Sequence, residues 1–345
     1  MNDTNSSPLI RLLEDQVGPK RWNILDRVQL IPEVLSTPPA GGSPQELSRA
    51  QVAMALATGF LIDLCERVPL AAAYLLECDL RKRKFVFDHG AMRTVAMDSG
   101  ALPAGRRAVE RILLPMGYQQ TEVYPLDRLG MNGYVYTHLD FPESIPQYFV
   151  SELEPEHFSP AFQRGVADLV RTSVDPIGPR SRASLQALEE RGSIGLEEAR
   201  VLLPKLQRAF SRHHREPTTE EYELFLQESA EMAWISTEGH TFNHITDRVA
   251  DVVAVAEGER RRGRPIKDTV EVSGSGRVRQ TAMRAGMVER LFRCAEGITI
   301  RTVPGSFIEF ISRDRLPDGR LDLAFDASNA QGIFKMTDSR KSSES

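Results

Sequence analysis

Two histidines stand four residues apart in a short polar segment, Thr237 to Val249, that follows a long helical stretch. His240 and His244 could bind one zinc ion on a helix, but the His-Glu-x-x-His pattern is absent and the surrounding residues favour a strand. On a strand the two side chains share a face, so His240 could be a ligand, a group that supports the ligand, or an ordinary histidine at a sheet edge. We expect His244 to bind a metal, with His240 and Asn243 supporting it.

Two other segments carry side chains that could complete a metal site. Glu309 stands in the apolar run from Phe307 to Ile311, where a carboxylate is costly to bury unless it is paired or bound to a cation. His89 and Arg93 are four residues apart in a strand-like run, so both side chains would point to one face. More ordinary explanations also fit. Glu309 could be the polar position of an alternating strand, and His89 and Arg93 could lie at the surface.

Two histidines and one carboxylate form the facial ligand set of non-haem iron enzymes, which leaves three positions of the ion open. His244, a second histidine and Glu309 together would form such a set for Fe(2+). Imidazole and carboxylate also suit other divalent ions, so these residues alone leave the native metal open.

The elements that would hold these residues form an α+β pattern that occurs twice. Strand, helix, strand and strand are predicted at residues 84–95, 103–116, 117–124 and 133–140, and again at 242–246, 247–262, 269–273 and 305–311, with a mixed stretch at 280–300. We expect an N-terminal helical region (1–83), a first module (84–150), a helical insertion (151–236), a second module (237–338) and a disordered tail (339–345).

The composition limits the class of protein. The chain of 345 residues is 41% hydrophobic, which is sufficient for a large core. Its net charge of −5 argues against a nucleic-acid-binding protein, and its three widely spaced cysteines indicate neither a disulfide framework nor a thiolate zinc site. The polar N-terminus and the absence of a long apolar run favour a cytoplasmic protein without a membrane partner. The oligomeric state stays open.

Two further motifs are better explained as local structure. The basic run from Glu259 to Pro265 contains Arg-Gly-Arg-Pro, which can enter a DNA minor groove, but it stands at a predicted helix end in an acidic protein. The segment from Ser273 to Gly276 is glycine-rich but is not followed by the Lys-Ser/Thr of a phosphate-binding loop.

The candidate residues lie in motifs that resemble those of the 2-oxoadipate dioxygenase/decarboxylases, a branch of the vicinal oxygen chelate superfamily. Matching pieces occur in order over about residues 84–338. They are His89-Gly90-Ala91-Met92-Arg93, Asn243-His244-Ile245-Thr246, Gly274-Ser275 with Gln280-Thr281, Phe307-Ile308-Glu309-Phe310, and the closing Phe325-Asp326 to Ile333-Phe334-Lys335-Met336-Thr337-Asp338.

The resemblance implies two βαβββ modules that curl into a half-barrel around Fe(II), held by His89, His244 and Glu309. It implies that Arg93 binds the remote carboxylate of the substrate, a role for which a guanidinium is well suited. Ser275 and Gln280 are expected on the substrate side. The implied reaction uses O2 to convert 2-oxoadipate into 2-hydroxyglutarate and CO2.

This chain also departs from the family pattern. Ile308 replaces an aromatic residue, the sequence around Gln280 has less serine, and residues 263–275 match poorly. A different 2-oxo acid in a biosynthetic pathway is therefore an alternative. Another is a vicinal oxygen chelate lyase, isomerase or hydrolase that uses Zn2+, Ni2+ or Mn2+. A third is a binding protein without enzymatic activity, whose helices form the working surface.

Overall fold

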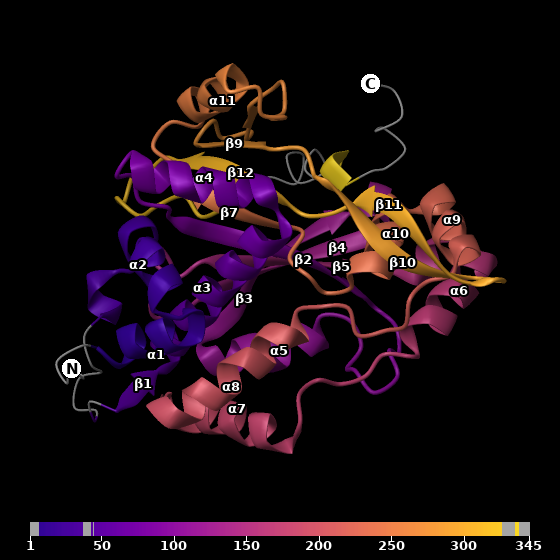
Figure 1. The fold of residues 1–345 in the computed structure, drawn as a ribbon, viewed down its shortest axis with the longest axis horizontal. Helices are drawn as coiled ribbons and strands as arrows, with labels where there is room; N and C mark the ends of the chain where they lie inside the picture. The colour runs from indigo at the N-terminus through magenta and orange to yellow at the C-terminus, as the bar shows by residue number, and fades with distance from the viewer. Residues whose placement is uncertain (1–6, 37–42, 44, 326–334, 338–345) are drawn as a thin grey trace.

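A mixed sheet of eight strands runs through the centre of the protein (Figure 1). The structure is a computed structural model that describes residues 7–36, 43, 45–325 and 335–337. The strands of the sheet are β2 (Phe87–Val95), β3 (Tyr118–Leu126), β4 (Met131–His138), β5 (Gln147–Leu153), β7 (His244–Arg248), β8 (Glu271–Val272), β9 (Val278–Ala282) and β12 (Phe307–Arg313). Their order across the sheet is β3-β4-β5-β2-β7-β12-β9-β8.

The strand order has an internal two-fold pattern. At the centre, β2 and β7 are antiparallel. Each of them pairs in parallel with the last strand of its own half, β5 or β12. Each is also followed along the chain by a helix, α5 (Arg107–Leu113) or α11 (Val252–Arg261). The α+β fold with two βαβββ modules in a curled sheet is therefore confirmed.

Two parts of the sheet differ from the prediction. The strand β5 was not predicted, and it extends past the expected end of the first module at residue 150. All of its residues are buried, so it lacks the polar alternation that marks a half-exposed strand. The mixed stretch at 280–300 contains β9 and then a separate hairpin, β10 (Met287–Cys294) and β11 (Gly297–Pro304), which forms its own two-stranded sheet.

Helices cover the sheet in two groups (Figure 1). These helices are α1 (Pro8–Val17), α2 (Pro19–Val28), α3 (Arg49–Arg67) and α4 (Pro69–Leu80), then α6 (Pro160–Val170), α7 (Pro179–Arg191), α8 (Leu196–Ala209), α9 (Thr219–Glu228) and α10 (Ala230–Glu238). The first group consists of the N-terminal helices together with α7 and α8, and the second consists of α6, α9 and α10. The N-terminal region and the insertion are joined by a short sheet in which β1 (Glu46–Ser48) pairs with β6 (Ser193–Gly195).

Local signals explain where several of these helices begin. Ser48 and Gln51 form a reciprocal capping box at the start of α3, and Thr218 and Glu221 do the same for α9. Within the described ranges, no helix is both long and apolar enough to span a bilayer. The predicted tail at 339–345 and residues 326–334 of the closing family motif lie outside the described residues.

The two faces of the sheet pack against different cores. Met92, Tyr148 and Phe310 belong to the larger core, which also contains residues of α3 and α4. Ala91 and Phe149 belong to a second core with residues of α6, α9 and α10. Because side chains alternate along a strand, the face of Ala91 is also the face of His89 and Arg93. The predicted site therefore lies between the central strands and the second group of helices.

Gly90 provides a test of this packing. A methyl group at Gly90 would lie 2.5 Å from the Phe242 ring, so Gly90→Ala must displace a buried side chain. We expect a loss of about 1–3 kcal/mol in the free energy of unfolding, measured by urea denaturation. Gly286→Ala is the control, since a methyl group there meets no atom within 4 Å. Equal stability of the two variants would contradict the packing.

Candidate metal centre

Three adjacent strands bring His89, His244 and Glu309 together. Their potential ligand atoms all lie within 4.8 Å of one another, and the three residues are buried. Glu309 Oε2 is 3.0 Å from His244 Nε2 and 3.3 Å from His89 Nε2. The register explains the arrangement, because His89 on β2 and Glu309 on β12 are both paired with Thr246 of β7, the strand between them.

The geometry and chemistry of these residues fit a divalent ion. Ligands about 2.1 Å from an octahedral ion and at right angles to one another lie about 3 Å apart, which agrees with the separations from Glu309 Oε2. The other oxygen, Glu309 Oε1, is buried without a hydrogen-bond partner among the described residues. A buried acceptor without a donor is costly, and a bound cation would remove that cost.

The protonation states of Glu309 and His244 favour metal binding. Burial acts to raise the pKa of Glu309, but the charges and hydrogen bonds of His244 and His89 hold it well below its usual range. Burial lowers the pKa of His244, which favours neutral imidazole. A metal requires an ionised carboxylate and neutral histidines, so Glu309 and His244 are held in their ligating forms. Burial acts to lower the pKa of His89, but the hydrogen bonds and charges of Asp88 and Glu309 raise it, so a metal would have to displace a proton from this ring.

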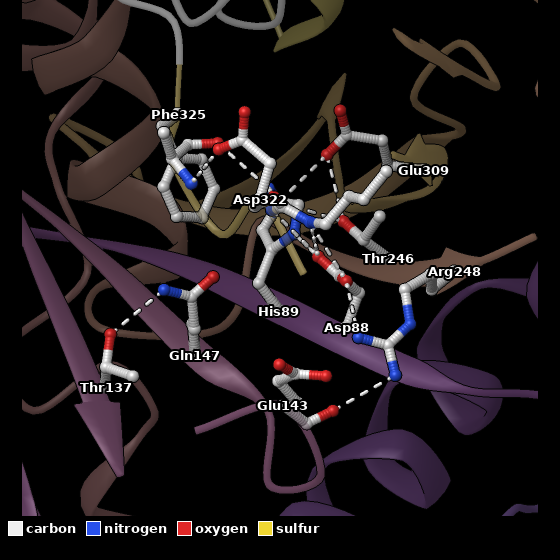
Figure 2. Close-up of polar contacts among 12 residues, drawn as sticks. Asp88, His89, Thr137, Glu143, Gln147, Thr246, Arg248, Glu309, Asp322 and Phe325 are labelled. Carbon is white, nitrogen blue, oxygen red and sulfur yellow. Dashed lines mark hydrogen bonds and ion pairs between the residues drawn. The ribbon is translucent and has the colours of Figure 1, made fainter. Parts of the chain in front are cut away.

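Asp88 orients His89, and this residue was not predicted. Its Oδ2 atom lies 2.9 Å from His89 Nδ1, so the ring can donate Nδ1–H to Asp88 and present Nε2 to a metal. The register between β2 and β7 shifts between Phe87 and His89, and this bulge places Asp88 beside the histidine. Arg313 donates to both oxygens of this carboxylate, with Nε 3.1 Å from Oδ1 and 3.0 Å from Oδ2. Figure 2 shows Asp88, Thr246 and Glu309 around His89.

One hydroxyl group contacts Glu309 and His89, and one amide group contacts His244. Thr246 Oγ1 donates to Glu309 Oε2 at 2.9 Å and lies 3.1 Å from His89 Nε2. Asn243 Nδ2 is 3.1 Å from His244 Nδ1, where the sequence predicted a supporting role. Asn243 Oδ1 is buried and has no partner among the described residues. If the side-chain amide of Asn243 is rotated by about 180°, Oδ1 can accept a hydrogen bond from Nδ1–H of His244. In that tautomer of His244, Nε2 carries no proton and is free to bind a metal.

Arg93 lies on the predicted face, but it contacts a carboxylate of the protein itself. Its Nη2 atom is 2.8 Å from Glu231 Oε2 and donates to Thr337 Oγ1 at 2.9 Å. The guanidinium also lies 4.6 Å from the centre of the Trp234 ring. Arg93 and Glu231 are both buried. No pattern in the sequence indicated a role for Glu231, which comes from α10 in the helical insertion.

The two other predicted substrate residues have different positions. Gln280 is buried on β9 and pairs with Ile311, two residues after Glu309, so its side chain shares the face of the metal ligands. Ser275 does not lie near them. It is exposed in the turn between β8 and β9 at the sheet edge, with its Oγ 3.0 Å from Ser273 Oγ.

His240 also lies apart from the metal ligands, contrary to the prediction. It lines a small cavity with His213 and His214. Burial and the charges of these two histidines lower the pKa of His240 to about 3. The chain turns sharply at Gly239, with φ of 63°, and β7 begins only at His244, so the two histidines do not share one strand face as expected.

Comparison with known proteins decides the family. The family model for 2-oxoadipate dioxygenase/decarboxylase matches residues 60–337, a range that contains all three candidate ligands. The chain belongs to this family. A curated relative, the chloroplastic/amyloplastic 2-oxoadipate dioxygenase/decarboxylase of Oryza sativa subsp. japonica, is 24% identical over 283 residues, which cover 73% of this chain and 69% of the relative.

Two solved structures share the fold of this family member. A glyoxalase superfamily protein from Ralstonia eutropha JMP134 is 45% identical, with a TM-score of 0.88 and coverage of 92% of this chain and 98% of the other. The hydroxyglutarate synthase of Oryza sativa in complex with 2-oxoadipate has a TM-score of 0.66 at 18% identity, with coverage of 86% and 95%. At that identity the second likeness shows the fold alone.

Asp88→Asn should weaken metal binding without removing a ligand. The new amide replaces one acceptor oxygen by an NH2 group, which cannot accept from Arg313 or His89 and faces one of these donors, so the His89 ring loses its orientation. We expect the dissociation constant for Fe(II), measured by anaerobic calorimetry, to rise about 10- to 100-fold. Asp140→Asn is the control, because Asp140 pairs with Arg49 outside the metal centre. Unchanged affinity in Asp88→Asn would contradict the role of Asp88.

Proposed function

We propose that this protein is an Fe(II)-dependent dioxygenase/decarboxylase of a 2-oxo acid, with 2-oxoadipate as the first candidate substrate. The observation that carries the proposal is the buried set of His89, His244 and Glu309, in a chain that belongs to the 2-oxoadipate dioxygenase/decarboxylase family. The balanced reaction joins one 2-oxoadipate and one O2 to give one 2-hydroxyglutarate and one CO2.

The ligand set supports the choice of an iron centre. His89, His244 and Glu309 would occupy one face of the ion and leave the other positions open. The chemistry that bound Fe(II) supplies is chelation of a 2-oxo acid through its carboxylate and keto oxygens, together with activation of O2. Asp88 and Thr246 would keep the ligand atoms aligned during turnover through the hydrogen bonds described above.

An apolar wall beside His89 would exclude water from the reacting groups. The Phe325 ring lies 4.8 Å from the His89 ring, measured between centres, and also contacts Phe149. Two polar contacts hold this residue in place. Its backbone N–H donates to the Tyr124 hydroxyl at 3.1 Å, and Arg313 Nη1 donates to the neighbouring carbonyl of Ala324 at 2.8 Å. Exclusion of water would strengthen electrostatic contacts to a charged substrate.

The spacing of Arg93 supports a substrate with a second polar end. Arg93 follows His89 by four residues on β2, a separation of about 13 Å along an extended strand. This separation suits a six-carbon diacid with one end at the metal and the other near the guanidinium. Its remote carboxylate would share the guanidinium with Glu231.

The ion pair between Arg93 and Glu231 favours a second candidate substrate, a 2-oxo acid whose far end is uncharged. Glu231 already balances the charge of Arg93 in a buried setting, where each added charge is costly. A substrate with a hydroxyl, amide or alkyl end would leave that balance unchanged. The two candidates share the metal centre and the reaction and differ only in the far end of the substrate.

The proposed reaction can be tested with protein reconstituted with Fe(II) under anaerobic conditions. On addition of air-saturated buffer, we expect equal molar uptake of O2 and release of CO2 with at least one member of a panel of 2-oxo acids. His244→Ala should abolish both. No uptake across the panel, or turnover supported equally by Zn2+, would instead favour a lyase, isomerase or hydrolase.

Glu231→Gln separates the two candidate substrates. The variant removes the negative charge of Glu231 from beside Arg93, so we expect kcat/KM for 2-oxoadipate to rise about tenfold, or about 1.4 kcal/mol, while that for 2-oxohexanoate stays the same or falls. Glu238→Gln is the matched control, because Glu238 is also a buried carboxylate of α10 and pairs with Arg290 instead. A fall in kcat/KM for 2-oxoadipate would show that Glu231 assists the diacid.

A further inference from the structure

The hairpin β10–β11 is an addition to the second module. It stands between β9 and β12 in the chain but leaves the eight-stranded sheet, and its two strands pair with each other as a separate sheet. In Figure 1 it extends to the right-hand edge of the molecule, next to α9 and α10. Two-stranded ribbons are marginally stable by themselves, so a ribbon of this length needs packing on at least one face.

One face of the hairpin packs against the protein. Phe292 and Val303 point to this face and are buried, and the Phe292 ring contacts Tyr222 of α9. The charged residues of the same face have partners. Arg290 pairs with Glu238, and Arg301 pairs with Glu223. This face is therefore fully accounted for by the helical insertion.

The opposite face is exposed and apolar at its centre. Leu291 is 49% exposed, and its neighbour across the ribbon, Ile300, is 59% exposed. Ile298 and Met287 extend the same face, at 59% and 49%. Four large apolar side chains on one side of a projecting ribbon are a feature of a surface that binds another protein.

The charges on this face are arranged symmetrically about Leu291. Glu289 lies two residues before it and Arg293 two residues after it, so all three side chains share the exposed face. Neither charged residue forms an ion pair within 4 Å with any other residue that the structure describes, in contrast to Arg290 and Arg301 on the packed face. The charge of Arg293 nevertheless contributes to lowering the pKa of Glu216 and of Glu221.

We propose that this face binds the same face of a second copy of the chain, with a two-fold axis through the row of Leu291 and Ile300. A rotation about that axis reverses the strand direction, so residues two before and two after the row face each other. Glu289 of one copy would meet Arg293 of the other, and Ile298 would meet Thr302, its counterpart across the row. Every contact then occurs twice, as a closed dimer requires.

The free edge of β10 gives a reason for contact through the faces. Near its end, the backbone N–H of Arg293 already donates to the carbonyl of Pro217 at 2.9 Å. Extension of the ribbon by a further strand on that edge would have to break this bond. The exposed face of Leu291 and Ile300 could be covered without breaking it.

Sedimentation velocity over a dilution series tests the proposal on the full chain. We expect a species of about twice the monomer mass of 38.6 kDa, and Leu291→Asp should convert it to monomer. Leu80→Asp is the control for the introduced charge, because Leu80 is 85% exposed at the end of α4. Circular dichroism should show that both variants are folded.

A charge exchange tests the pairing itself. Glu289→Arg alone and Arg293→Glu alone should each weaken the dimer by placing like charges together, and the double variant should restore it. A wild-type protein that stays monomeric at every concentration would overturn the proposal. So would a dimer that survives Leu291→Asp, or a double variant as weak as the single ones.

Discussion

The burial of the Glu309 carboxylate between two imidazoles is the interaction on which the rest of the site depends. An ionised carboxylate in an apolar strand is unstable unless positive or donating groups surround it closely. Here those groups come from β2 and β7, so β7 must lie beside β12, and β2 beside β7, in one register. The burial of the Glu309 carboxylate therefore requires that β2, β7 and β12 be adjacent in this order.

The doubled module explains how that order is reached. Each module ends with a strand parallel to its first strand, and the two first strands meet at the centre of the sheet. The site forms where the modules join, and its ligands are divided unequally, with His89 from the first module and His244 and Glu309 from the second. Because the halves need only share a topology, their sequences can diverge while the junction keeps its geometry.

Around the ligands, buried charges occur in pairs that bear on function. Asp88 and Arg313 orient His89, and Arg93 and Glu231 balance each other at the far end of the same strand face. The first pair would serve any reaction at this metal centre. Under the proposed function, the second pair would face the remote end of the substrate, where its net neutrality would favour an uncharged end over the carboxylate of 2-oxoadipate.

The sequence by itself determined the identities of the three candidate ligands and the doubled α+β pattern. Histidine and glutamate are conspicuous within β-forming runs, and strand and helix periodicity is a local property of the chain. Tertiary structure alone decided the roles of Asp88, Thr246 and Glu231, because a bulge, a strand register and a helix from the insertion bring them to the site. It also separated His240 and Ser275 from the ligands, since a turn and a sheet edge, which spacing cannot reveal, carry them elsewhere.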